Sequence, residues 1–107
     1  MQNHLLQILT ITAMNKPKSL NAQDVRDEKV KILRAIKPLH LDNVLIGQYT
    51  DSKDGSQPGY LADKGVPKDS ITPTYAAAAF YIHTKEWEGV PFILKCGKGF
   101  YLNSFIF

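Results

Sequence analysis

The stretch from Glu86 to Lys98 constrains the fold more than any other, because it joins a turn, a strand and a terminal cation. Two alternating sets of side chains follow the turn and are apolar up to Lys95: Val90, Phe92 and Leu94, and between them Pro91 and Ile93. This pattern is typical of a β-strand that is covered on both faces over most of its length. We therefore expect a buried strand with a polar end.

The end of this strand carries a glycine and a lysine. Gly97 lets the backbone turn or lie close to a ligand, and Lys98 offers ammonium donors that a phosphate or a carboxylate could accept. Taken alone, however, a Gly-Lys pair more often marks a strand followed by a solvated loop lysine.

Composition narrows the class of protein. With 107 residues, of which 44% are hydrophobic and 21% charged, the chain has the profile of one globular domain or a piece of a larger one. Its thirteen Lys and Arg are scattered among ten acids, which gives a net charge of +3 and no basic stripe, so no nucleic-acid partner is indicated. Cys96 is the only cysteine. We expect it to pack inside the strand, and we expect no metal site.

The sequence predicts no membrane partner and no targeting segment. No apolar run has the length that crosses a bilayer. The first such run, Leu5 to Met14, follows no basic cluster and is interrupted by polar residues, unlike a signal peptide.

Two helices are predicted in the first third of the chain. Apolar side chains surround most of the helical wheel from Met1 to Met14, which indicates a helix buried inside something larger. No capping residue precedes it, so the chain looks cut within a helix. The second helix runs from Asp24 to Lys37, where Asn21 and Asp24 resemble a capping box and Asp27 and Lys31 form an acid-to-base pair. Its apolar stripe consists of Val25, Ile32, Leu33 and Ile36.

The rest of the chain favours strands. Val44 to Tyr49 has strand composition, with Gly47 as a bulge or a point of close approach. Glycine and proline residues, which interrupt helices and strands, are frequent from Thr50 to Pro73. This indicates an irregular connection between sheet elements. In Tyr75 to His83 the alanines favour a helix, but the segment is short and follows a proline, so we predict a strand paired antiparallel with Val90 to Cys96. The fold class is therefore α+β, with two helices followed by strands of a largely antiparallel sheet.

Four segments resemble glucose-6-phosphate dehydrogenase in sequence, order and spacing: MQNHLLQ at Met1–Gln7, VRDEKVK at Val25–Lys31, GQY at Gly47–Tyr49 and WEGVPFILKCGK at Trp87–Lys98. The resemblance implies that residues 1–98 are part of that enzyme's larger C-terminal domain, which binds substrate and forms the dimer. Residues 99–107 depart from the family pattern, so we expect a divergent tail there. An internal start and such a tail suggest a partial gene model or a mis-spliced product.

The resemblance also implies site residues. The histidine of the Asn-His-Leu-Leu motif, here His4, is the family's general base, which takes the proton from the anomeric hydroxyl of glucose 6-phosphate while hydride passes to NADP. Lys98 matches the lysine at the glucose 6-phosphate site. Lys95 matches a basic position near a second, structural NADP in eukaryotic members. Without the family, a lone histidine at the start of an apolar helix is more often a polar boundary residue, and His40 and His83 match no motif and are expected at the surface or in loops.

The function implied is the oxidation of glucose 6-phosphate to 6-phosphogluconolactone in the pentose phosphate pathway, by a homo-oligomer located in the cytoplasm or in a plastid. No glycine-rich dinucleotide loop follows a strand in this chain, so we expect the isolated chain to be inactive. The alternative is a non-catalytic fragment that dimerises or binds a parent subunit through its sheet edge.

Overall fold

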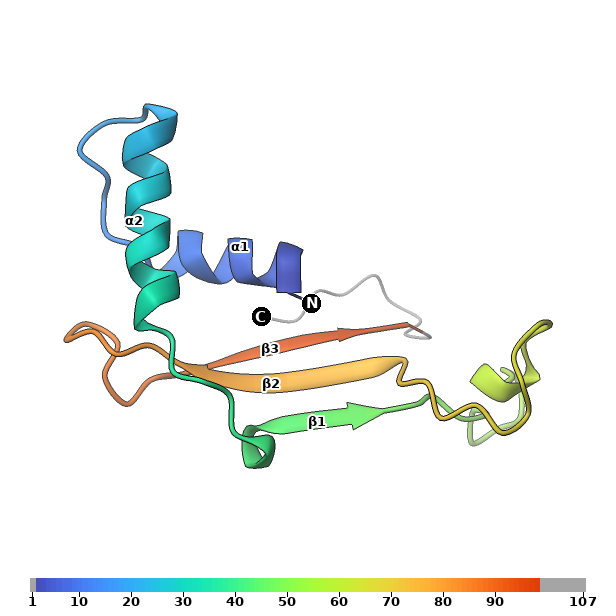
Figure 1. Ribbon diagram of the computed structural model, residues 1–107. Coiled ribbons are helices and arrows are strands. Elements are labelled where there is room, and N and C mark those ends of the chain that lie inside the picture. The colour runs from blue at the N-terminus through green and yellow to red at the C-terminus, as the bar shows by residue number, and fades with distance from the viewer. Residues whose placement is uncertain (1, 99–107) are drawn as a thin grey trace.

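The computed structural model of the chain describes residues 2–98, which form two helices and a three-stranded sheet (Figure 1). The elements are α1 (Gln2–Ala13), α2 (Ala22–Ala35), β1 (Val44–Gly47), β2 (Tyr75–Tyr81) and β3 (Pro91–Gly97), with short 3₁₀ turns at Leu41–Asn43 and Tyr60–Ala62. The predicted α+β class is confirmed. The expected divergent tail at residues 99–107 lies outside the described residues and stays a prediction.

The sheet has the order β1-β2-β3, and both pairs are antiparallel. Tyr75 pairs with Gly97 at one end of β2 and Tyr81 with Pro91 at the other, so the predicted strand pair is confirmed. The alanines of β2 form a strand despite their helix propensity, because β2 is hydrogen-bonded along both edges and small side chains suit a central strand close to a helix.

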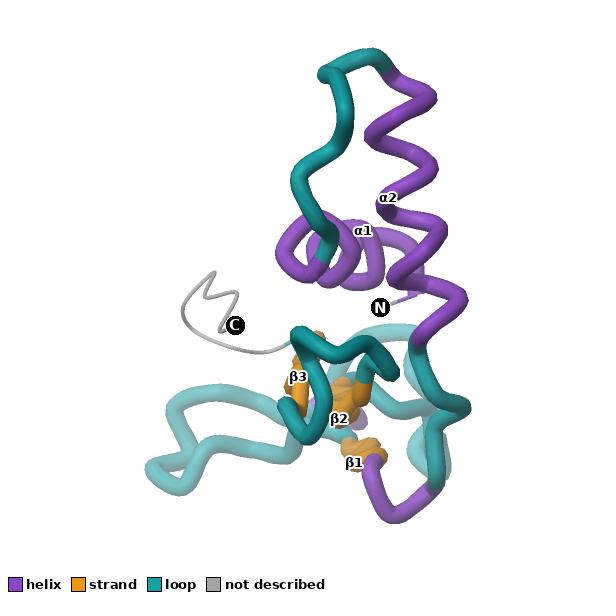
Figure 2. Tube along the Cα trace, turned by 90° about the vertical axis from the view of Figure 1, so that its left-hand side faces the viewer, coloured by secondary structure: helices purple, strands orange, loops and turns teal. Residues whose placement is uncertain are grey.

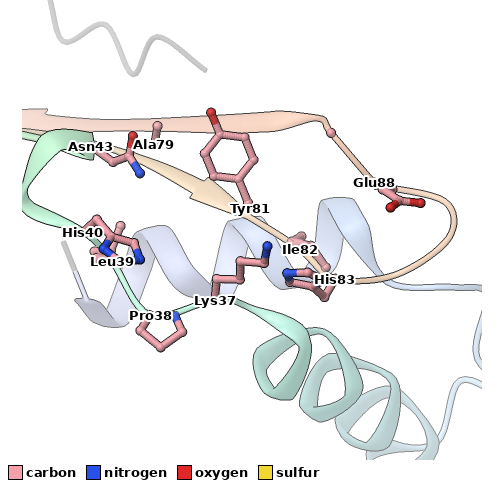
Figure 3. Close-up of a pocket in the computed structure, with 11 residues that line it drawn as sticks. Lys37, Pro38, Leu39, His40, Asn43, Ala79, Tyr81, Ile82, His83 and Glu88 are labelled. Atoms are coloured by element: carbon pink, nitrogen blue, oxygen red, sulfur yellow. The ribbon is translucent and has the colours of Figure 1, made fainter.

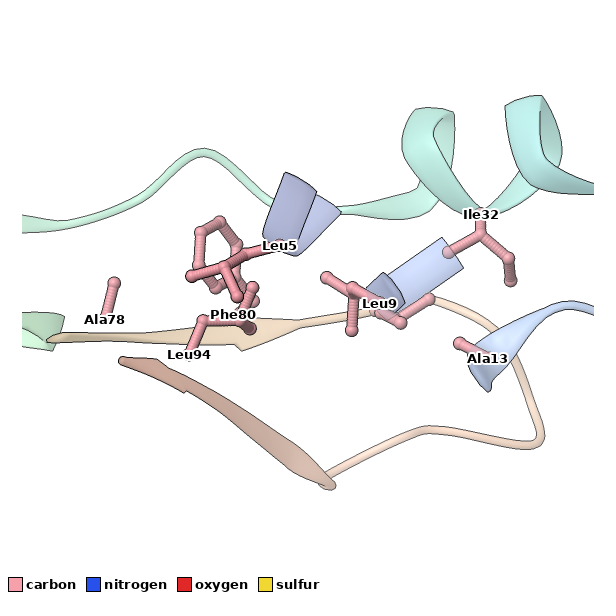
Figure 4. Close-up of a cluster of buried hydrophobic side chains, with 8 residues drawn as sticks. Leu5, Leu9, Ala13, Ile32, Ala78, Phe80 and Leu94 are labelled. Carbon is pink, nitrogen blue, oxygen red and sulfur yellow. The ribbon is translucent and has the colours of Figure 1, made fainter. Parts of the chain in front are cut away.

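Both helices lie on the same side of the sheet, with α1 stretched over β2 and β3 (Figures 1 and 2). The core between these layers is small and takes residues from every main element except β1: Leu5, Leu9 and Ala13 of α1, Ile32 of α2, Ala78 and Phe80 of β2, Leu94 of β3, and Ile82 just beyond β2 (Figure 4). The hydroxyl of Thr10, which is also buried, donates a 2.9 Å hydrogen bond to the carbonyl oxygen of Gln7. This bond satisfies the polar group at the edge of an apolar layer.

The prediction that β3 is covered on both faces is wrong. Leu94 points toward α1 and is 9% exposed, whereas its neighbour Ile93 is 54% exposed. The alternation arises because successive side chains of a strand point to opposite faces, and the helices cover one face of the described sheet. Leu45 of β1 is also exposed on the uncovered face, opposite Ala77.

The N-terminus of α2 is capped as predicted. The Asn21 side chain accepts a 2.8 Å hydrogen bond from the backbone N–H of Asp24, which satisfies one free donor of the first turn. The helix ends at Ala35, two residues before the predicted end, because Ile36 has extended backbone and bridges Ile82. The predicted pair of Asp27 with Lys31 is also wrong, because the Lys31 ammonium contacts Glu28 at 2.5 Å.

The connection from β1 to β2 is irregular, as predicted, apart from the 3₁₀ turn at Tyr60–Ala62. Gly47 forms no bulge and pairs regularly with Tyr75. Two backbone segments approach closely instead at Gly59, where an added Cβ would lie 2.7 Å from the backbone of Asp51.

Within the connection from β1 to β2, hydrogen bonds from the Ser52 side chain and from Ser56 lower the pKa of Asp54 to about 2.

Trp87 ties the turn between β2 and β3 to the end of α1. Its indole N–H donates a 2.9 Å hydrogen bond to the carbonyl oxygen of Ala13, and its ring packs edge-on against Phe92 with centroids 5.1 Å apart. The last turn of a helix has free carbonyl groups, and this bond satisfies one of them. The two ends of the helix layer are thus fixed by different contacts, Trp87 at one end and Leu5 at the other.

Leu9→Ala tests whether this core supports the fold. Leu9 is 4% exposed at the centre of α1, so its truncation should lower the free energy of unfolding by roughly 2–5 kcal/mol. The matched control is Ile11→Ala on the same helix, which is 56% exposed and should change stability by about 0.5 kcal/mol or less. Urea unfolding followed by Trp87 fluorescence measures both, and equal losses in the two variants would contradict the assigned layer.

Candidate active site

His4 lies in the first turn of α1 and is exposed, while the next residue, Leu5, is buried against the sheet. Figure 4 shows Leu5 lying over Phe80 and Leu94. Because neighbouring residues of a helix differ in direction by about 100°, burying Leu5 leaves the His4 side chain at the rim of the helix. The packing of one leucine therefore fixes where this imidazole can reach.

Lys98 follows the last residue of β3, and its side chain is exposed. Its backbone N–H donates a 2.9 Å hydrogen bond to the carbonyl oxygen of Thr74, so the residue continues the strand pair one step beyond Gly97. The turn that Gly97 was expected to permit does not occur at that residue, because Gly97 is still paired with Tyr75 in the ladder.

His4 is in the first turn of α1 and Lys98 directly follows β3, and these two element ends lie in the same half of the two-layer structure (Figure 1). Figure 1 shows α1 running opposite to β3, so that the N-terminal part of the helix lies toward the C-terminal half of the strand. Leu94, below Leu5, is four residues before Lys98, which corresponds to roughly 13 Å along an extended strand. The side chains of His4 and Lys98 can extend toward each other and so reduce this separation. We call the region between these two residues the His4–Lys98 corner.

The electrostatics of this corner favour an anion. Lys98 supplies a positive charge, and the N-terminal end of α1 supplies the partial positive charge of a helix dipole. A second cation lies one turn further along the helix, where the Lys29 ammonium of α2 donates a hydrogen bond to the side-chain oxygen of Gln7. A base and a cation at one corner can act on a substrate that carries a hydroxyl at one end and a phosphate at the other.

Lys95 lies away from this corner. It pairs with Ala77 and shares the uncovered face of the sheet with Ile93, whereas α1 covers the opposite face. The two lysines of the Lys-Cys-Gly-Lys segment therefore lie on opposite faces of the sheet. A strand reverses the direction of its side chains at every residue, so this separation follows from the register.

The other singled-out residues lie as expected. His40 and His83 are exposed and lie in connecting segments. Cys96 is half-buried and packs against the core from β3. In the described part of the chain no three His, Cys, Asp or Glu side chains come together as a metal site, and no helix there is long and apolar enough to cross a membrane.

The comparisons with known proteins identify the family. A family model described as "Glucose-6-phosphate dehydrogenase, C-terminal domain" matches residues 1–104. The chain belongs to the glucose-6-phosphate dehydrogenase family. The resemblance carried by the four motifs is thereby confirmed.

Curated relatives are similar over nearly the whole chain. The glucose-6-phosphate 1-dehydrogenase of Dictyostelium discoideum is 60% identical over 98 residues, which cover 92% of this chain and 20% of that protein. The chloroplastic glucose-6-phosphate 1-dehydrogenase of Nicotiana tabacum is 57% identical over 106 residues, covering 97% of this chain and 18% of that protein. The chain thus spans about a fifth of the length of these relatives.

Solved structures agree with the fold. A glucose-6-phosphate dehydrogenase in complex with its substrate glucose 6-phosphate superimposes with a TM-score of 0.84 and 50% identity, covering 91% of this chain and 20% of that one. The glucose-6-phosphate 1-dehydrogenase of Mycobacterium avium superimposes with a TM-score of 0.77 and 38% identity over the same shares. The two helices and the antiparallel sheet are therefore a segment of this family's C-terminal domain.

Proposed function

We propose that this chain supplies part of the substrate site of an NADP-dependent glucose-6-phosphate dehydrogenase, which oxidises glucose 6-phosphate to 6-phosphogluconolactone in the pentose phosphate pathway. The observation that carries the proposal is the position of His4 in the first turn of α1 and of Lys98 directly after β3, in a fold shared with this family. A base and a cation there suit the two ends of one sugar phosphate.

In this proposal His4 is the general base. Its imidazole accepts the proton of the anomeric hydroxyl, so the O–H electrons can form the carbonyl of the lactone as the hydrogen on the same carbon leaves as hydride. Imidazole suits this step because it can accept a proton near neutral pH. The rim position of His4 beside the buried Leu5 limits the directions from which a sugar can approach.

Lys98 is proposed to hold the 6-phosphate. An ammonium group is a compact charge with three donors, which suits a phosphate that keeps its charge throughout the reaction. Because this contact is the same in the ground state and the transition state, it contributes binding and not rate. The backbone bond to Thr74 holds the lysine at the strand end.

The described residues do not include the kind of fold that usually binds a dinucleotide coenzyme. NADP accepts the hydride in this family, and a dinucleotide is usually held by a parallel βαβ unit with a glycine-rich loop. The described sheet is antiparallel throughout, so it does not fit this role, and we derive no step through NADP from it. Lys95, on the uncovered face, is proposed to contact the phosphate of a second, structural NADP.

A second candidate function is a non-catalytic interaction fragment. The observation that favours it is the uncovered sheet face, where Leu45 and Ile93 are exposed, together with the outer edges of β1 and β3. Such a face and such edges can pair with another chain. A homo-oligomer located in the cytoplasm or a plastid is proposed for the whole enzyme.

A polypeptide of these 107 residues alone is expected not to reduce NADP with glucose 6-phosphate. Much of the rate enhancement of such an enzyme comes from holding both reactants in the right geometry. The described residues do not form a fold that binds NADP. The measurement is NADPH absorbance with the purified chain, made in a host whose own dehydrogenase gene is deleted. Sustained turnover above the buffer rate would contradict this expectation.

His4→Asn should lower kcat by roughly a hundredfold to ten-thousandfold, because Asn keeps hydrogen bonding but accepts no proton. The change is made in a chimaera in which residues 1–98 replace the matching segment of the 60% identical Dictyostelium enzyme. Steady-state kinetics should show a small change in KM. A kcat within a few-fold of the parent, with affinity lost instead, would make His4 a positioning residue.

Lys98→Ala in the same chimaera should mainly raise KM for glucose 6-phosphate and change kcat less, because it removes uniform binding. Lys18→Ala is the matched control, since Lys18 is an exposed lysine in the connection between α1 and α2. If the two variants gave the same KM, Lys98 would not be a phosphate contact.

A further inference from the structure

A hollow of about 400 Å³ lies at the far end of β2 from Lys98. Three segments bound it: the connection from α2 to β1, the end of β2, and the turn toward β3 (Figure 3). Its lining includes Ala79 and Tyr81, which lie on the face of the sheet that α1 leaves uncovered. Tyr75 and Tyr81 are six residues apart, which places the hollow roughly 20 Å along β2 from the His4–Lys98 corner.

Backbone pairing brings two of the basic side chains of this hollow together. Ile36 and Ile82 form an antiparallel bridge, beside which the Lys37 N–H donates to the Tyr81 carbonyl at 3.1 Å and the His83 N–H donates to the Ala35 carbonyl at 2.8 Å. Ile82 points into the core and is 2% exposed. Because side chains alternate along extended backbone, Lys37, Tyr81 and His83 share the opposite, outward side.

His40 reaches the same hollow from the loop before β1. The backbone N–H of Asn43 donates to the His40 carbonyl at 3.0 Å, which closes the 3₁₀ turn and holds both residues at the rim. Lys37, His40 and His83 all line the hollow, and Figure 3 shows Lys37 and His40 on the connection from α2 to β1. Three nitrogen-bearing side chains thus surround one space, together with one acid, Glu88.

These side chains have no partners within the described residues. The ion pair found in that part of the chain is between Lys31 and Glu28, and neither Lys37 nor either of the two histidines makes a side-chain hydrogen bond there. Donors that converge on a hollow without pairing to one another can bind an external acceptor at little cost in broken contacts.

We propose that this hollow binds a phosphate monoester of a small ring compound. Donors that approach from two separate segments suit the several oxygens of a phosphate better than the two coplanar oxygens of a carboxylate. The volume falls within the range of small-molecule sites and exceeds a bare phosphate. The ring of Tyr81 and the side chains of Pro38 and Leu39 provide apolar walls for the remainder of the ligand. This site is separate from the proposed function of the His4–Lys98 corner.

The test is a titration of the chain with phenyl phosphate, followed by the imidazole C–H and backbone amide resonances. Saturable shifts at His40 and His83 are expected, with weaker binding of inorganic phosphate and none of phenol. Equal affinities for phenyl phosphate and inorganic phosphate would overturn the ring part of the proposal. Absence of any saturable shift at the two histidines would overturn the whole.

Variants distinguish a specific binding site from nonspecific attraction of a phosphate to a positively charged chain. Lys37→Ala should weaken phenyl phosphate binding roughly tenfold, the usual effect of one charge-assisted contact. Lys18→Ala is the control with the same change of net charge, and it should not alter the shifts at His83. His83→Gln gives a second, independent variant of the hollow. Equal weakening by Lys37→Ala and Lys18→Ala would contradict the site.

Discussion

The packing of α1 on the sheet is the contact on which the rest of the described structure depends. Leu5 lies over Phe80 and Leu94, and Leu9 belongs to the same buried cluster. This packing also sets the position of His4, which is next to Leu5 and is held at the rim for that reason. The small core and the proposed general base therefore depend on the same few side chains, so loss of packing would displace His4 as well as lower stability.

Coverage of one sheet face divides the molecule into two chemically different sides. On the covered side lie the N-terminal end of α1 and Lys98, which are proposed to bind a sugar phosphate. On the other side lie Lys95, the exposed Ile93 and the hollow near Tyr81. The period of two in a strand assigns each residue to its side. Two lysines three positions apart thus serve different surfaces, although their chemistry is the same.

The candidate site was predicted from a family resemblance and not from residue chemistry, and the roles of its residues stay predictions. Nothing in a lone histidine or in a Gly-Lys pair distinguishes a base or a phosphate contact from ordinary surface residues. Four motifs in register carried the prediction, and the family match confirms the resemblance on which it rests. The hollow with Lys37 and His83 had no such signal. Its residues are far apart in sequence and meet through the bridge between Ile36 and Ile82, which depends on how α2 ends.

The sequence by itself determined the local elements of this protein. Asn21 starts α2 through a cap, and alternating apolar residues define β3, because caps and periodicity act over a few residues. Tertiary structure alone decided which face of β3 is buried and where α2 ends. These features depend on contacts between segments distant in the chain, which local pattern does not encode.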